Sequence, residues 1–363
     1  MAELILDSLR IENFRAFRQI KVSKLGRVNL IVGKNNTGKS SMLEALYIYA
    51  REGQPDAIWN ILKARGESTT SRTRSQREQE ADIEQRALDI KYILHNRADL
   101  TDTQEIRIGS LQQLWKHLSL SIGWYAADER GRRIAQQPLI EDISELFLIA
   151  RMGEKSEFSY NLGRYFMRLS PPEDTKGIKY TLIPAAGLGF TDIGKFWDNI
   201  TLTDLEKEVI QALKIIEPTI EGLSFITNNS NRRREPVIRT ARYNERLPLR
   251  SLGEGVNRLL GIVLALVNAK DGLLLIDEVE SGLHYSVQPD MWRLVFRVAD
   301  ELNIQVFATT HSKDCLESFQ HVSQEHAEEG VLIRLGYRKG DIVTSIFDET
   351  DLADAVEQDV EVR

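Results

Sequence analysis

The sequence has little cysteine and no long apolar run. Of its 363 residues only Cys315 is a cysteine, which excludes a disulfide framework and a cysteine-rich zinc site. The longest apolar run, LLGIVLALV at 259–267, is far shorter than the roughly 20 residues that cross a membrane. The beginning, MAELILDSLRIENF, lacks the basic segment and apolar block of a secretory signal. These absences predict a cytoplasmic protein without a membrane-spanning segment.

The chain also lacks an excess of positive charge, because its formal net charge is −7. This balance argues against a surface that binds nucleic acid throughout, although it allows a local basic patch. Residues 228–250 form such a patch, with seven arginines against two glutamates. Arg232, Arg233 and Arg234 are candidates for contacts with DNA phosphates. An acidic protein partner and an exposed hairpin without any partner are the alternatives.

Apolar residues are scarce in residues 65–85, where only Ala81 and Ile83 are apolar. The segment therefore predicts a mobile loop or a solvated helical arm. The strand patterns EIRI, LSLSIGWYA, LFLIARM and KYTLIP follow within residues 86–185 and favour an antiparallel sheet. Residues 203–216 have helical apolar spacing after a threonine cap.

The two ends of the chain alternate strands with helices, which predicts an α/β fold. A hairpin is expected within residues 5–22, a strand at 27–32 and a helix from Ser40 to Glu52. The later elements are a helix at 254–268, a strand at 273–276, a helix at 284–300, a strand at 304–309 and two strands within 331–347. We expect a central, mostly parallel sheet flanked by helices, with an antiparallel β subdomain and a small helical insertion. The expected divisions are an N-terminal lobe (1–52), an inserted region (53–249), a C-terminal lobe (250–347) and an acidic helix (348–363).

The segment GKNNTGKSS fits the phosphate-binding pattern G-x-x-x-x-G-K-[ST] between a strand and a helix. Glycine lets backbone N–H groups approach phosphates, and the following helix directs its N-terminus at them. Lys39 is expected to reach the β- and γ-phosphates, Ser40 to hold Mg²⁺, and Asn36 to accept a left-handed backbone. The nucleotide-binding candidates are Gly33, Asn35, Asn36, Thr37, Gly38, Lys39, Ser40 and Ser41.

Two later apolar strands end in polar residues. LLLIDE ends in Asp277 and Glu278, and IQVFATT is followed by His311. Because ligands bind at the carboxyl ends of parallel strands, these side chains are expected at the nucleotide. Asp277 is predicted to hold Mg²⁺, Glu278 to polarise the attacking water, and His311 to contact the γ-phosphate or that water. The Asp-Glu pair favours a hydrolase over a small-molecule kinase.

The motifs GKNNTGKSS, SLGEG, LLLIDE, ESGLH and ATTHS occur in the order of ABC-type ATPases. The chain resembles the branch of these ATPases that includes RecF, SMC-type proteins and the OLD family. DEVESGLHYS and FATTHS are most similar to OLD-like AAA-family ATPases of bacterial defence systems. The sequence contains no Asp-x-Asp pair, so the Toprim nuclease domain of OLD proteins is not expected.

The resemblance implies an ABC-type P-loop head that sandwiches ATP and Mg²⁺ between two copies, in a homodimer or a higher oligomer. Ser251 and Gly253 would contact the γ-phosphate across the dimer, and Glu254 stands where relatives often have glutamine. The implied function is an ATPase whose nucleotide state controls a separate effector, a nuclease, in antiviral defence. The alternative is a RecF-like DNA-binding ATPase in repair or recombination. These motifs leave the choice between ATP and GTP open.

Overall fold

The computed structural model describes most of the chain. The described residues are 3–68, 85, 87–100, 103–134, 144–154, 156–165, 177–227, 234–326 and 329–347. Of the segment 65–85, for which we predict a mobile loop or a solvated helical arm, residues 69–84 lie outside them. So do Arg232, Arg233 and the predicted acidic helix at 348–363.

A six-stranded sheet in the order β15-β14-β3-β13-β12-β8 forms the centre of the molecule. Five neighbouring strands, β14, β3, β13, β12 and β8, run parallel to one another. The edge strand β15 pairs antiparallel with β14. This agrees with the parallel sheet expected from alternating strands and helices. The strands are β3 (Val28–Gly33), β8 (Tyr180–Ile183), β12 (Leu273–Ile276), β13 (Gln305–Thr309), β14 (Gly330–Arg338) and β15 (Asp341–Phe347).

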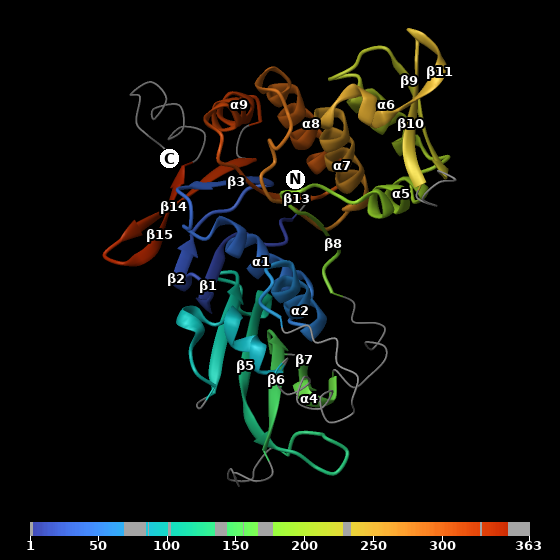
Figure 1. The fold of residues 1–363 in the computed structure, drawn as a ribbon. Helices are drawn as coiled ribbons and strands as arrows, with labels where there is room; N and C mark the ends of the chain where they lie inside the picture. The colour runs from blue at the N-terminus through green and yellow to red at the C-terminus, as the bar shows by residue number, and fades with distance from the viewer. Residues whose placement is uncertain are drawn as a thin grey trace.

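Helices cover both faces of the central sheet (Figure 1). Because alternate side chains of a strand point to opposite faces, β3 contributes Leu30 to one core and Ile31 to the other. The core around Leu30 includes residues of α7, α8 and α9, and the core around Ile31 includes residues of α1 and α2. These helices are α1 (Lys39–Ala50), α2 (Pro55–Ala64), α7 (Glu254–Asn268), α8 (Gln288–Glu301) and α9 (Lys313–Ser323).

An antiparallel sheet in the order β2-β1-β4-β5-β6-β7 packs beneath α1 and α2. It contains the predicted hairpin and the patterns EIRI, LSLSIGWYA and LFLIARM. The strands are β1 (Leu9–Phe14), β2 (Phe17–Val22), β4 (Gln104–Gly109), β5 (His117–Ala126), β6 (Ser144–Met152) and β7 (Ser156–Asn161).

The pattern KYTLIP does not belong to that antiparallel sheet, and our expectation for it was wrong. It forms β8, which pairs in parallel with β12 at the edge of the central sheet, with Ile183 opposite Ile276. A short apolar alternation fits either sheet, because the pattern specifies a pleated strand and leaves its neighbour undefined.

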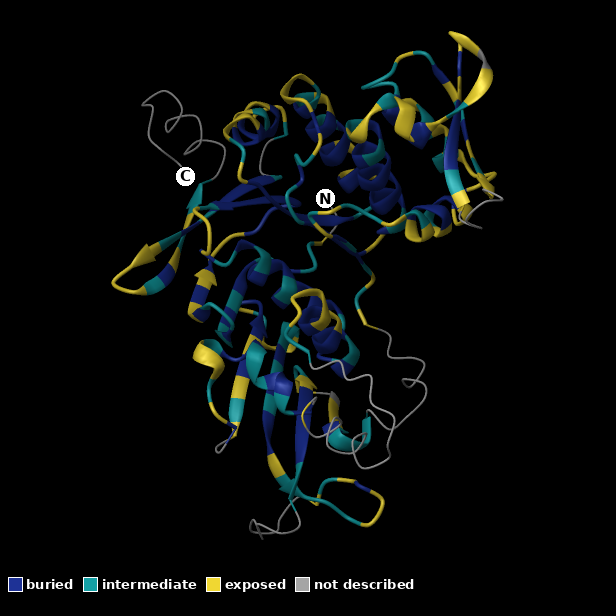
Figure 2. Ribbon diagram, in the orientation of Figure 1, coloured by how far each residue is buried: buried dark blue, intermediate teal, exposed yellow. Residues whose placement is uncertain are grey.

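A third sheet, in the order β11-β10-β9, lies beside α5 and α6 (Figure 1). The middle of β10 is buried, whereas β11 is mostly exposed (Figure 2). Thr203 stands at the N-cap position of α6, yet its hydroxyl donates to Ile200 O at 2.6 Å instead of capping the helix. The bounds are α5 (Phe190–Asp198), α6 (Asp204–Leu213), β9 (Ile220–Thr227), β10 (Arg234–Thr240) and β11 (Tyr243–Pro248).

Short helices complete the described part of the chain. The helix expected at 284–300 begins at Gln288 in the structure, after a 3-10 turn that precedes Pro289. In the ranges that the structure describes, every helix is too short or too polar to cross a bilayer. The short helices are η1 (Asp89–Ile93), η2 (His95–Arg97), η3 (Leu114–Lys116), α4 (Leu162–Tyr165), η5 (Leu249–Leu252) and η6 (Tyr285–Val287).

Candidate nucleotide site

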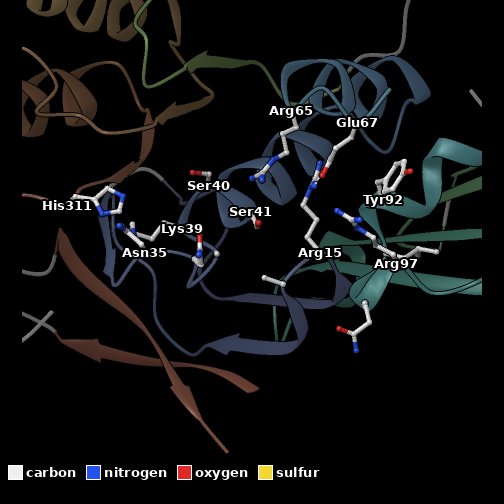
Figure 3. Close-up of a pocket in the computed structure, with 15 residues that line it drawn as sticks. Arg15, Asn35, Lys39, Ser40, Ser41, Arg65, Glu67, Tyr92, Arg97 and His311 are labelled. Atoms are coloured by element: carbon white, nitrogen blue, oxygen red, sulfur yellow. Dashed lines mark hydrogen bonds and ion pairs between the residues drawn. The ribbon is translucent and has the colours of Figure 1, made fainter. Parts of the chain in front are cut away.

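A cavity of about 650 Å³ lies at the carboxyl end of β3, next to the N-terminus of α1. We call it the P-loop cavity, since its inner end is lined by Asn35, Asn36, Gly38, Lys39, Ser40, Ser41 and His311. Its outer end is lined by residues of the β1–β2 turn and by residues that follow α2 (Figure 3). The volume lies within the range typical of small-molecule and cofactor sites.

The loop between β3 and α1 has the backbone that its sequence predicts. Asn36 has a φ of 65°, the left-handed conformation expected for it, and Tyr337 donates a hydrogen bond to its carbonyl at 2.8 Å. Gly38 has a φ of 90°, and a Cβ there would stand 2.7 Å from the ring of Phe17. Thr37 is buried and donates to Lys34 O at 2.8 Å. These contacts fix a loop whose N–H groups stand at the start of a 12-residue helix.

Lys39 folds back over the loop that precedes it. Its Nζ donates to Gly33 O at 2.7 Å and to Lys34 O at 3.0 Å. Burial lowers the pKa of Lys39, while the nearby carboxylates of Asp277, Glu278 and Glu280 raise it. Among the described residues, this buried ammonium is held by neutral carbonyls, with carboxylates farther away. Such an ammonium is suited to a stronger anionic partner, such as a phosphate.

Asp277 is anchored between β12, β13 and α1. Its Oδ1 accepts from Thr309 Oγ1 at 2.6 Å, and its Oδ2 accepts from Ser40 Oγ at 3.1 Å. Thr309 Oγ1 also accepts from the N–H of Glu278 at 2.9 Å, which ties the two strand ends together. One carboxylate beside one hydroxyl suits Mg²⁺, which usually takes few protein ligands and several oxygens from water and phosphate. Among the described residues no cluster of three or more His, Cys, Asp or Glu side chains is arranged to hold a metal.

Glu278 and His311 face each other across the ends of β12 and β13. Glu278 Oε1 lies 3.9 Å from His311 Nε2, and Glu278 Oε2 accepts from Ser281 Oγ at 3.2 Å. The N–H of His311 donates to Glu280 Oε1 at 3.0 Å. The side chains of Glu278 and His311 are 43% and 41% exposed, so both are accessible to a ligand.

The loop at residues 251–254 lies elsewhere. Ser251 is exposed and donates to Pro248 O at 2.7 Å, while Gly253 and Glu254 line a second cavity of about 770 Å³ that we call the loop cavity. Gly253 has a φ of 97° with no atom within 4 Å of a Cβ position, so backbone conformation rather than space requires glycine. One copy of the chain therefore brings Lys39, Ser40, Asp277, Glu278 and His311 to one sheet edge, but not Ser251, Gly253 and Glu254.

No sequence motif assigned a role to Arg15, which lies in the turn between β1 and β2. The Arg15 side chain is 7% exposed, with Nε 2.8 Å from Glu44 Oε2 and Nη1 2.9 Å from Glu67 Oε2. Its Nη2 is buried and has no hydrogen-bond partner among the described residues, and Arg15 lines the P-loop cavity. Burial raises the pKa of Glu44, while Arg15 and Arg65 lower it. Arg15 therefore lies at the wall of the cavity as a buried guanidinium shared by two carboxylates.

Tyr92 and Arg97 line the outer end of the same cavity (Figure 3). The Arg97 guanidinium lies 5.1 Å from the centre of the Tyr92 ring. Asn96 and Arg97 both have left-handed backbones, with φ values of 54° and 52°. These residues come from a stretch without a motif, so no sequence signal identified them.

The basic patch is partly neutralised within the molecule. Arg234 pairs with Asp198, with Nη2 donating to Oδ1 at 3.0 Å, and Arg239 Nε lies 3.2 Å from Glu221. Side-chain hydrogen bonding to Asp198 raises the pKa of Arg234. At least these two described arginines already have acidic partners.

Comparison with known proteins agrees with this site. The model of the AAA ATPase domain family matches residues 5–144 and 191–316. An "ATP/GTP phosphatase" of Helicobacter pylori is 26% identical over 346 residues, covering 88% of this chain and 89% of that protein. The "DNA replication and repair protein RecF" of Idiomarina loihiensis is 31% identical over 75 residues, covering 20% of this chain and 21% of that protein.

Two solved structures of SMC heads are also similar. The SMC head bound to the C-terminal winged-helix domain of ScpA has a TM-score of 0.49 at 13% identity, covering 94% of this chain and 98% of that chain. The SMC head domain of Thermotoga maritima has a TM-score of 0.44 at 14% identity, covering 93% and 97%. Because the family model spans most of the chain, including the P-loop and the strand ends at Asp277 and His311, this chain belongs to the AAA ATPase domain family and is an ATPase.

Proposed function

We propose that the chain binds ATP with Mg²⁺ in the P-loop cavity and hydrolyses it at the end of β12. The observation that carries this proposal is the convergence of Ser40 on Asp277 and of Glu278 on His311 at one sheet edge. Lys39 would exchange its contacts with loop carbonyls for the β- and γ-phosphates. Arg15 lines the same cavity, with its guanidinium paired to Glu44 and Glu67.

Each residue at the sheet edge has a distinct role in the proposed hydrolysis. Ser40 and Asp277 would hold Mg²⁺, which when bound neutralises charge on the β- and γ-phosphate oxygens. Glu278 Oε1, on the side facing His311, accepts a hydrogen bond from the attacking water and then its proton. Ser281 holds the other carboxylate oxygen, so that Glu278 keeps this orientation. His311 donates from Nε2 toward the γ-phosphate or orients the water.

We infer that two copies complete each other's sites. Residues 251–254 lie outside the P-loop cavity of their own chain. Ser251 is exposed, and α7 begins three residues later, at Glu254. The first N–H groups of a 15-residue helix favour an anion, and a second copy related by a twofold axis can supply one from its own cavity. Ser251, Gly253 and Glu254 would then face the γ-phosphate of the partner copy in a homodimer, which can also build a higher oligomer.

The nucleotide state of this homodimer would control a separate effector, a nuclease acting in antiviral defence. The support is the resemblance of DEVESGLHYS and FATTHS to OLD-like ATPases. The second candidate is a RecF-like DNA-binding ATPase. It is favoured by the match to RecF over 75 residues and by the basic patch, although Arg234 and Arg239 are already paired.

One experiment tests the activity and separates the two candidates. Phosphate release from ATP and from GTP is measured with and without Mg²⁺, and then with and without duplex DNA. Absence of hydrolysis with either nucleotide would contradict the proposed activity. Replacing Arg232, Arg233 and Arg234 by alanine is compared with a matched triple alanine variant at Arg130, Arg132 and Arg133, another cluster of three arginines.

DNA stimulation that disappears only in the first variant would favour the RecF-like candidate. No effect of DNA, combined with copurification of a nuclease encoded beside this gene, would favour the effector candidate.

A further inference from the structure

Arg258 is a buried arginine in the second turn of α7, and no motif marks it. Only 8% of the residue is exposed. Its Nη1 donates to Pro184 O at 3.1 Å, and its Nη2 donates to Asp277 O at 2.8 Å and to Glu278 O at 2.6 Å. One guanidinium thus holds three carbonyls, which follow two neighbouring strands, β8 and β12.

The turn that Arg258 holds has an unusual backbone. Glu278 has a φ of 47°. This left-handed backbone conformation is seldom adopted by residues other than glycine, asparagine and aspartate. Such conformations persist when surrounding contacts enforce them, and they concentrate at functional sites. Thr309 fixes the N–H of Glu278 and Arg258 fixes its carbonyl, so the peptide groups on both sides of the side chain are anchored.

Three carboxylates lie near the Arg258 guanidinium and favour its positive charge. Burial lowers the pKa of the guanidinium, and the carboxylates of Glu280, Asp277 and Glu278 raise it. Arginine remains charged under such conditions, and its planar fork can donate to several carbonyls at once. A lysine of similar length has one nitrogen and cannot reproduce this geometry.

We propose that Arg258 is a positioning residue for ATP hydrolysis, which holds the left-handed turn at Glu278 so that its carboxylate faces His311. The same side chain links this turn to α7, whose first residue, Glu254, belongs to the loop at 251–254. Displacement of α7 would therefore move the carbonyl of Glu278 directly. This inference rests on the proposed role of Glu278.

The experiment compares Arg258→Ala and Arg258→Lys with Arg297→Ala, which removes an exposed arginine of α8 that pairs with Glu208 and Glu301. The measurements are the affinity for ATP, kcat and the unfolding temperature. We expect kcat to fall about 100-fold in both Arg258 variants, the loss that a displacement of about 1 Å causes. The affinity for ATP should stay close to that of the parent, because Arg258 is not among the residues lining the P-loop cavity.

Chemical rescue separates positioning from a general structural role. The loop cavity of about 770 Å³ is lined in part by Arg258, Gly187 and Gly261, and it gives methylguanidinium access to the space left by Arg258→Ala. We expect methylguanidinium to raise kcat of Arg258→Ala and to leave Glu278→Gln and Arg258→Lys unchanged. If Arg258→Ala does not fold, the loss of kcat at unchanged ATP affinity in Arg258→Lys carries the test.

Parental kcat in the Arg258 variants, together with a slow Glu278→Gln variant, would overturn the inference and leave the proposed function intact. A joint loss of kcat, ATP affinity and unfolding temperature without rescue would also overturn it. Parental kcat in Glu278→Gln would refute the role of Glu278, and the inference would fall with it.

Discussion

Replacing Glu278 by glutamine removes the proposed base while preserving the shape of the side chain. The amide oxygen of glutamine can still accept from Ser281, as Oε2 of Glu278 does at 3.2 Å. The ion pair with His311 is long, at 3.9 Å, and both side chains are more than 40% exposed. Loss of that pair should therefore change the free energy of unfolding by less than about 1 kcal/mol.

The effect on catalysis should be much larger. A positioned general base contributes about 10²–10⁴-fold to a rate, which corresponds to about 3–5 kcal/mol of activation free energy. We expect Glu278→Gln to bind ATP as the parent does and to lose kcat by this factor. Because the bound nucleotide then persists, the proposed ATP-bound homodimer should accumulate.

The assay measures phosphate release with Mg²⁺, ATP binding by titration, and mass by light scattering with ATP. Glu317→Gln is the matched control, because Glu317 lies on α9 in an exposed pair with Lys313. It should retain the parental rate. A Glu278→Gln protein that turns over ATP as fast as the control would refute the assignment of the base.

Three further predictions concern the loop between β3 and α1 and the proposed homodimer. Lys39→Ala should weaken ATP binding about 100-fold or more, because each charge-assisted hydrogen bond contributes about 1.5–3 kcal/mol; tight binding of a fluorescent ATP analogue would contradict the site. Gly38→Ala should lower the free energy of unfolding by at least about 1–2 kcal/mol, since a left-handed backbone is costly for alanine and its Cβ meets Phe17; urea denaturation measures this, and an unchanged midpoint would argue against it. Mixing Lys39→Ala with Ser251→Arg chains should leave one intact site in each mixed dimer, restoring about a quarter of the parental rate at equal amounts; failure to restore activity at any ratio would count against shared sites.

The elements at both ends of the chain could be predicted because their apolar patterns are long and bounded. The strand at 273–276 and the helix at 254–268 were predicted with the bounds that the structure has. The pattern KYTLIP was assigned to the wrong sheet, because a strand of four residues does not specify its neighbour. The pairing with β12 depends on backbone contacts far apart in the sequence.

At the site, too, sequence patterns identified some residues and not others, because a pattern does not specify contacts between distant segments. The motifs identified Lys39, Asp277 and His311 because each follows a strand or begins a helix in a known order. Arg258 lies within a helix whose pattern predicts only burial, and its contacts with three carbonyls become visible only in three dimensions. Tyr92 reaches the P-loop cavity through a short 3-10 helix that no periodicity predicts.

The position of β3 in the central sheet has a consequence for how the protein is made. Val28 of β3 pairs with Val306 on one side and with Gly330 on the other. The ribosome therefore synthesises β3 long before the two strands that pair with it. The P-loop that follows β3 cannot be held in its final place until both have emerged. A nascent chain released before residue 330 would leave β3 without one of its neighbours, and its apolar edges would be open to chaperones or aggregation. Acquisition of ATP binding is therefore expected late in synthesis, after the strand at Gly330–Arg338 has been made.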